Sequence, residues 1–239
     1  MLKQKFIIGL ALLMAMVLGS QANVLARAKK KNVKFKVRIE NVSNSAGLMA
    51  QDGSKYPFAL SPGLFVVSNN KMDFFKTGKK ASAGIEAQAE DGNPGVLSKD
   101  LLPKVGSVYM GIFNTPVGAN GAAPILPGGA YEFTFMADEG MKFNLIAMYG
   151  QSNDLFYAPE KAIDLFVDGE AINGDITDKM MLWDAGTEVN QAPGIGSDQA
   201  PRQKGPNTGA AENGKVGMVK DAFTYPNTKD VLKITISQE

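Results

Sequence analysis

The stretch that decides the fold class is Val33-Lys34-Phe35-Lys36-Val37-Arg38-Ile39-Glu40, in which apolar and charged residues alternate throughout. Successive side chains of a β-strand point to opposite faces of the sheet, so a period of two residues separates a buried face from a solvated one. The segment therefore predicts a strand with one face in a hydrophobic core.

The same kind of pattern continues further along the chain, mainly in its second half. Short apolar segments bounded by Gly- and Pro-containing turns predict strands over residues 107–113, 131–135, 141–149, 162–167 and 231–237. Many short strands with turns between them favour an antiparallel sandwich over alternating strands and helices. We predict an all-β fold, an antiparallel β-sandwich, as one domain over residues 33–239.

Two segments break this pattern and predict short helical insertions. Residues 58–75 are apolar but are interrupted by Pro62 and Gly63, which predicts a short helix or an irregular apolar segment. Residues 79–89 are rich in Ala and Glu and precede Asp91-Gly92-Asn93-Pro94-Gly95, a strong helix stop, which predicts a short helix.

The first 22 residues have the pattern of a secretory signal peptide. Two lysines precede the apolar stretch Phe6–Leu18, and small residues follow it, with cleavage expected after Ala22 and with Ala26 or Ala28 as alternatives. A transmembrane anchor is the other interpretation, but about 13 apolar residues are short for a hydrocarbon core of roughly 30 Å. We expect a secreted or periplasmic protein with no transmembrane segment after processing.

The charge balance argues against a nucleic-acid partner. The chain has 25 Lys+Arg and 24 Asp+Glu, and removal of residues 1–22 leaves 23 basic and 24 acidic residues. The basic run Arg27–Lys36 lies beside the cleavage region, so we predict a basic flexible arm over residues 23–32. Attraction of this arm to a polyanion stays open as an alternative.

Neither Cys nor His occurs in the chain. Their absence excludes Ser-His-Asp and Cys-His catalysis, disulfides and the usual zinc ligands. An exported chain without cysteine is typical of bacterial envelope proteins more than of eukaryotic extracellular modules. Any bound metal is expected to be a hard cation held by oxygen atoms.

The candidate site lies where a long polar loop begins. Residues 184–220 are rich in Gly and Pro and poor in bulky apolar residues, and a loop of this length is uncommon inside a compact domain unless it is functional or disordered. It starts with Trp183-Asp184-Ala185-Gly186-Thr187-Glu188-Val189-Asn190. A turn at Gly186 would direct Asp184 and Glu188 to one point, as calcium ligands require. The alternative is an exposed acidic turn anchored by a buried Trp183.

This string also resembles the Trp-Asp-Ala-Gly-Thr-Asp/Glu signature of the spondin N-terminal domain family. Upstream, Ser152-Asn153-Asp154-Leu155-Phe156 is similar to a second conserved segment of that family. Residues 81–92 and 190–209 resemble its bacterial branch. The resemblance extends over roughly residues 33–237.

The resemblance implies a C2-domain-like sandwich with calcium at one end, held by Asp154, Asp184 and Glu188. This chain departs from the metazoan members by having Glu188 as the second acid of the signature and by lacking their cysteines. The family pattern implies no catalytic activity.

We therefore predict an exported calcium-binding module, not an enzyme, that recognises an unidentified protein or glycan ligand at the cell envelope or outside the cell. One alternative is a structural envelope protein stabilised by the ion. A second is a glycoside hydrolase that uses the same acids, with Trp183, Phe156 or Tyr157 stacking on sugars.

Overall fold

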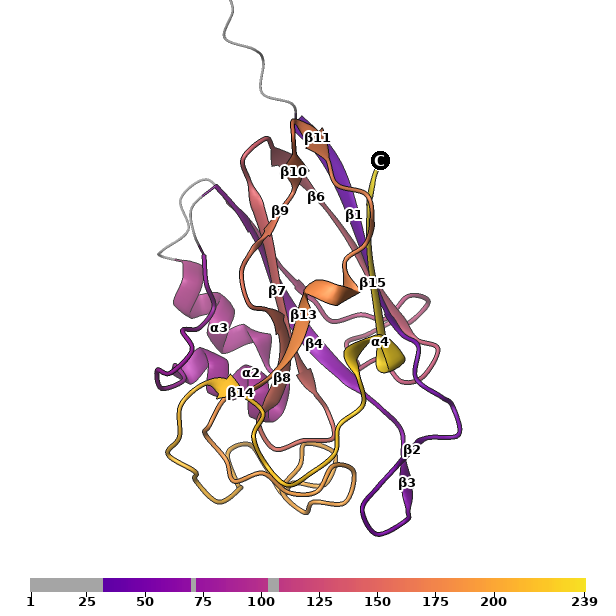
Figure 1. The fold of residues 1–239 in the computed structure, drawn as a ribbon, viewed down its shortest axis with the longest axis vertical. Helices are drawn as coiled ribbons and strands as arrows, with labels where there is room; N and C mark the ends of the chain where they lie inside the picture. The colour runs from indigo at the N-terminus through magenta and orange to yellow at the C-terminus, as the bar shows by residue number, and fades with distance from the viewer. Residues whose placement is uncertain (1–31, 70–71, 103–107) are drawn as a thin grey trace, which may run out of the picture. The chain divides into compact units, whose positions relative to one another are not determined.

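The computed structural model describes residues 32–69, 72–102 and 108–239, and in these residues the chain forms two antiparallel sheets packed face to face (Figure 1). The smaller sheet has the order β12-β15-β1-β6 and consists of β1 (Asn32–Asn41), β6 (Ala130–Asp138), β12 (Gly174–Asp175) and β15 (Leu232–Gln238). The larger sheet has the order β14-β13-β8-β7-β4-β5, with β9 paired to β7. Its strands are β4 (Leu60–Ser68), β5 (Val108–Phe113), β7 (Lys142–Tyr149), β8 (Leu155–Pro159), β9 (Ile163–Asp164), β13 (Met180–Asp184) and β14 (Gly217–Met218).

Two small hairpins and four helical segments complete the described fold. The hairpins pair β2 (Leu48–Met49) with β3 (Lys55–Tyr56) and β10 (Phe166–Val167) with β11 (Glu170–Ala171). The helical segments are α2 (Ala83–Asp91), α3 (Pro94–Leu101), the short α4 (Thr228–Val231) and the 3-10 turn η2 (Thr177–Lys179). The predicted all-β sandwich with short helical insertions is therefore confirmed.

Strand β1 has the two faces that its alternation predicts. Phe35, Val37 and Ile39 are fully buried, whereas the charged residues between them are half-buried. Ile39 lies opposite Tyr131 of β6 and Ile234 of β15, so the apolar faces of three neighbouring strands coincide. The strand begins at Asn32, the last residue of the predicted basic arm and one residue before the predicted start of the domain. The predicted signal peptide and the rest of that arm lie outside the described residues.

The core between the two sheets is built largely from aromatic rings. Phe65 of the larger sheet stacks on Phe133 of the smaller one, with ring centroids 4.2 Å apart and planes inclined by 10°. Phe35 stacks on Phe135 at 5.6 Å within the smaller sheet. Stacked pairs of this kind add to the free energy gained by burying apolar area, so this layer stabilises the sandwich without disulfides.

The larger sheet is buried on both faces because α2 and α3 cover the face that points away from the smaller sheet (Figure 1). Ile85 of α2 and Leu97 of α3 belong to a second apolar cluster with Phe156 and Trp183 of the sheet. The fold thus has three layers, and the strands of the middle layer carry apolar residues on both sides.

The prediction for residues 58–75 was wrong, because this segment contains β4, a central strand of the larger sheet. Its residues are almost all buried, so the sequence shows a continuous apolar run without alternation. Pro62 is tolerated because the pairing of β4 with β7 shifts between Leu60 and Gly63. Gly63 is needed there, since a Cβ would lie 2.2 Å from the carbonyl oxygen of Ile146.

The predicted helix at 79–89 is confirmed as α2, with later boundaries. Ser82 caps its first turn by accepting a hydrogen bond from the backbone N–H of Ile85, and Gly92 ends it in the left-handed region at φ 61°. Helix α3 was not predicted, because it begins at Pro94, within the segment that was interpreted as a helix stop. Asn93 accepts from the N–H of Gly95 as its cap, and Pro94 takes the first helical position.

The remaining strand predictions agree with the structure in position more than in length. β6, β7 and β15 match the predicted segments to within a few residues, and β5 matches except for Ser107, which lies outside the described residues. The segment 162–167 forms two short strands, β9 and β10, instead of one. β8 and β13 were missed, and both belong to the doubly covered sheet.

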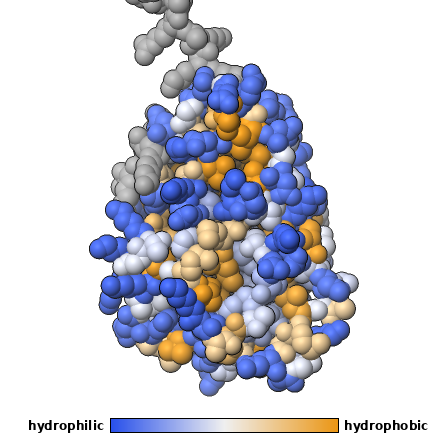
Figure 2. Space-filling view, viewed as in Figure 1, coloured by the Kyte–Doolittle hydropathy of each residue, from blue (hydrophilic) through white to orange (hydrophobic). Residues whose placement is uncertain are grey.

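The exposed surface gives little information about a partner. Figure 2 shows a mostly hydrophilic face with apolar side chains near the β10–β11 hairpin, where Val167 is 55% exposed. Scattered exposures of this kind are ordinary for folded domains. Among the described residues, no helix is long and apolar enough to cross a membrane.

Candidate metal centre

The turn between β7 and β8 places Asp154 at one end of the larger sheet. The Ser152 hydroxyl donates to the carbonyl oxygen of Tyr149 at 2.6 Å and accepts from the N–H of Leu155 at 3.1 Å. These two bonds fix the turn, because one short side chain satisfies backbone groups on both sides of it. Asp154 is fully buried as a result.

The strand register brings Asp184 beside Asp154. Asp184 ends β13 and lies opposite Leu155, the first residue of β8. Its Oδ1 accepts from the N–H of Gly186 at 2.6 Å, and Gly186 turns the chain with φ 67°. The family resemblance implied that Asp154 and Asp184 belong to one site, and the register of β8 and β13 places the two residues side by side.

Glu212 joins the two aspartates because residues 186–189 pair with residues 210–214. The N–H of Val189 donates to Ala210 O at 2.8 Å, the N–H of Glu212 to Thr187 O at 2.9 Å and the N–H of Gly214 to Gly186 O at 2.7 Å. The chain therefore returns to the end of β13 after a long excursion. One carboxylate oxygen from each of Asp154, Asp184 and Glu212 lies within 4.8 Å of the others.

Glu188, which the sequence analysis placed with the two aspartates, lies outside this three-carboxylate group. Its Oε1 accepts from the N–H of Gly209 at 2.9 Å and its Oε2 from the Asn153 side-chain amide at 3.3 Å. Glu188 is almost fully buried and ties the loop to the β7–β8 turn. Sequence reasoning missed Glu212, for which the only signal was an acid within the long polar loop.

The two oxygens of the Asp154 carboxylate have different surroundings. Oδ2 accepts three hydrogen bonds, from the backbone N–H of Thr187 at 2.7 Å, the Thr187 hydroxyl at 3.1 Å and the N–H of Glu188 at 3.1 Å. Oδ1 is buried and has no hydrogen-bond partner among the described residues. A buried acceptor without a partner costs free energy, so its place requires an explanation.

A second oxygen near Asp184 is in the same condition. The Asn190 side-chain NH₂ group donates to Asp184 Oδ2 at 2.7 Å. The buried Oδ1 of Asn190 itself has no hydrogen-bond partner in the part of the chain that the structure describes. Carboxylate and amide oxygens are the usual ligands of Ca²⁺, which takes six to eight of them at about 2.3–2.6 Å. The donor set fits a hard cation better than it fits a soft one.

The three acids repel one another when all of them are ionised. Burial and, to a lesser extent, the charge of Asp184 raise the pKa of Asp154 to about 7. Burial also raises the pKa of Asp184, while burial and the charges of Asp184 and Asp221 raise the pKa of Glu212. No Lys or Arg of the described residues forms an ion pair with the three carboxylates. A divalent cation would remove this repulsion.

Trp183 holds the end of β13 in place. Its ring is buried and meets Phe75 edge to face with centroids 4.9 Å apart, and its indole N–H donates to the carbonyl oxygen of Ala158 at 3.0 Å. This is the anchoring role that the sequence analysis offered for Trp183. The anchor fixes the backbone from which Asp184 projects.

Comparison of the chain with known protein families and with curated proteins finds no match to either.

Proposed function

We propose that this protein is a calcium-binding module in which Asp154, Asp184 and Glu212 hold the ion. The observation that carries the proposal is the buried, unpartnered Oδ1 of Asp154 beside two further carboxylates. Calcium would supply the missing positive charge and take the free oxygens as ligands. The resemblance to the spondin N-terminal domain is in keeping with a calcium site at this end of the sandwich.

The ion would act by ordering the loop that follows β13. Its three ligands come from the β7–β8 turn, the end of β13 and the returning segment 210–214, so one ion connects all three. The loop between them is held by polar contacts, for example through the fully buried Gln199, and contains few apolar anchors. An ion that cross-links its two ends would therefore stabilise a surface suited to recognition.

We favour binding over catalysis because a general acid must reach its substrate. Asp154 has the raised pKa that a glycosidase acid needs, but it is fully buried under the loop. The predicted export signal is compatible with the proposal, since extracellular modules meet calcium at concentrations that suit weak sites.

Glu212 and Glu188 offer a direct test of the ligand set. Glu212→Gln should weaken calcium binding by about tenfold or more, because affinity follows the number of charged ligands. Glu188→Gln should leave the affinity nearly unchanged, since its carboxylate already accepts two hydrogen bonds within the protein. Calorimetric titration of each purified variant with calcium measures both constants.

The matched control is Glu139→Gln, in the exposed turn between β6 and β7. Its calcium affinity should equal that of the parent protein. If Glu188→Gln weakens binding and Glu212→Gln does not, the ligand set predicted from the sequence is right and the three-carboxylate group is wrong.

The stability of the metal-free protein should fall as the pH rises from about 4 to 7. Asp154 has a pKa of about 7 in the folded state against an ordinary value of 3.8, so the folded state binds more protons in this window. Glu90, whose pKa burial also raises to about 7, acts in the same direction. Bound calcium displaces the proton of Asp154, so the stabilisation by calcium should be larger at pH 8 than at pH 5.

Thermal unfolding at pH 5, 6, 7 and 8, on protein stripped of metal at pH 8 and then exchanged into each buffer, measures this dependence. Asp154→Asn should make the unfolding midpoint less dependent on pH and leave only the dependence that is due to Glu90. A calcium effect of equal size at pH 5 and pH 8 would contradict the involvement of Asp154.

A further inference from the structure

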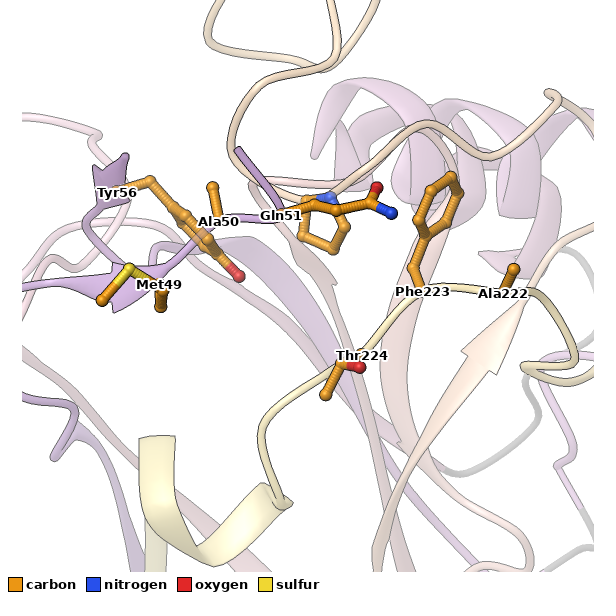
Figure 3. Close-up of a pocket in the computed structure, with 8 residues that line it drawn as sticks. Met49, Ala50, Gln51, Tyr56, Ala222, Phe223 and Thr224 are labelled. Atoms are coloured by element: carbon orange, nitrogen blue, oxygen red, sulfur yellow. The ribbon is translucent and has the colours of Figure 1, made fainter. Parts of the chain in front are cut away.

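A cavity of about 230 Å³ opens between the β2–β3 hairpin and residues 222–224 (Figure 3). Gln51 and Tyr56 lie on the hairpin side, Phe223 and Thr224 lie on the opposite side, and Pro193 of the long loop also lines the cavity. No side chain that lines it is charged. The cavity therefore suits a neutral ligand.

The walls of the cavity present the groups that a sugar ring uses. Phe223 is half-buried, so part of its ring is open to a ligand, and the Gln51 amide extends toward it (Figure 3). Gln51 and Thr224 are exposed and offer an amide and a hydroxyl, which both donate and accept hydrogen bonds. The C–H face of a sugar packs on an aromatic ring while its hydroxyls pair with such groups. A small cavity with two aromatic residues, of which Phe223 is the more exposed, and a few polar groups matches this ligand better than it matches a charged one.

The Phe223 side of the cavity is related to the metal centre through the charge of Asp221. Asp221 accepts from the N–H of Phe223 at 2.8 Å and from the Tyr225 hydroxyl at 2.6 Å. The charge of Asp221 also acts on Asp184 and Glu212, two of the three carboxylates of the metal centre. A cation there would draw Asp221 toward it and fix the segment that carries Phe223.

The Tyr56 side of the cavity packs against Gly194 of the long loop and contacts Tyr149 of β7. Gly194 lies so close to Tyr56 that an added Cβ would be 2.1 Å from the ring. The Tyr56 hydroxyl hydrogen-bonds the Tyr149 hydroxyl at 2.9 Å, and the Tyr149 ring meets Tyr225 edge to face at 6.1 Å. Both sides of the cavity thus depend on segments next to the acids.

We propose that this cavity binds one uncharged sugar residue of a glycan, stacked on Phe223, and that the cation shapes the cavity. The inference rests on the proposed function for its calcium dependence and goes beyond it by assigning the ligand class and its place. A peptide ligand is the competing outcome.

The test screens the protein against an array of neutral and charged oligosaccharides, in calcium and in chelator, and then measures affinity for the best neutral glycan. Calcium should raise that affinity at least tenfold. Phe223→Ala should lower it at least tenfold and leave the calcium-induced rise of the unfolding midpoint unchanged. The control Tyr109→Ala removes another exposed ring, on β5 and outside the cavity, and should change neither quantity.

Three results would overturn the inference: no binding to any neutral glycan, equal binding by Phe223→Ala and the parent, or selection of peptides in place of glycans by a displayed library. Phe223-dependent binding that persists in chelator would overturn the role of the cation alone. If calcium stabilises the protein and no glycan binds, the proposed function stands and only this inference fails. If calcium has no effect on stability, the proposed function fails whatever the array shows.

Discussion

Calcium in hundredfold excess over its dissociation constant is expected to raise the unfolding midpoint by about 5–10 °C relative to chelator. Ligand binding to the folded state adds RT ln(1+[L]/Kd), about 2.7 kcal/mol at this excess, and a domain of this size gains about 2–4 °C per kcal/mol. The three carboxylates of the metal centre make this the largest ligand effect that we expect. Differential scanning calorimetry measures it.

Asp154→Asn should remove the calcium-induced rise of the unfolding midpoint. Whether the parent or the variant is the more stable should therefore depend on calcium. Without calcium, the variant should be at least as stable as the parent at pH 8, because an amide replaces a buried charge beside Asp184. Its oxygen can still accept from Thr187 and Glu188, and its NH₂ group takes the place of the unpartnered Oδ1. With calcium, the parent should be the more stable of the two.

Asp178→Asn serves as the control, since Asp178 lies exposed in η2 and should not influence the calcium response. Equal midpoints of the parent in calcium and in chelator would contradict the metal centre. A large loss of stability in Asp154→Asn without calcium would mean that the carboxylate has a purely structural role.

Trp183→Ala is expected to cost about 3–5 kcal/mol of unfolding free energy, which lowers the midpoint by about 6–20 °C. The ring is the largest side chain of the second apolar cluster, and its removal leaves a cavity between the larger sheet and Phe75. It also leaves the carbonyl oxygen of Ala158 without its indole donor. Urea denaturation measures the loss.

Trp183→Phe makes the cavity smaller, because it keeps an aromatic ring in the cluster while it removes the indole N–H and part of the ring system. We expect it to cost about 1–2 kcal/mol. Since Trp183 precedes Asp184, the alanine variant should also bind calcium more weakly. A loss below about 1 kcal/mol in Trp183→Ala would show that Trp183 does not anchor β13.

Burial on one face made β1 easy to predict, whereas burial on both faces concealed β4 and β8 although not β7. β1 is covered on one face, so Phe35, Val37 and Ile39 alternate with charged residues and identify the strand. β4 and β8 lie between the other sheet and the helices, and their apolar runs carry no period. The helix at 79–89 was predicted, but α3 and the packing of both helices over the larger sheet were not, so a third layer was not expected.

Of the candidate site, the family resemblance predicted the grouping of Asp154 with Asp184, although strands β8 and β13 were not predicted. Asp154 and Asp184 come together because Leu155 and Asp184 are paired across β8 and β13. Glu212 reaches them through the pairing of 186–189 with 210–214, whose partners no local pattern reveals. The spacing of Asp184 and Glu188 predicted one common site, but Gly209 and Asn153 hold the Glu188 carboxylate elsewhere.

The most direct test of the metal centre is a calorimetric titration of metal-free protein with calcium at pH 7.5, for the parent and for the triple variant Asp154→Asn, Asp184→Asn, Glu212→Gln. The proposed site predicts one calcium ion per chain for the parent and no measurable binding by the triple variant, with both proteins folded by circular dichroism. Absence of binding by the parent, or equal binding by the two proteins, would contradict it.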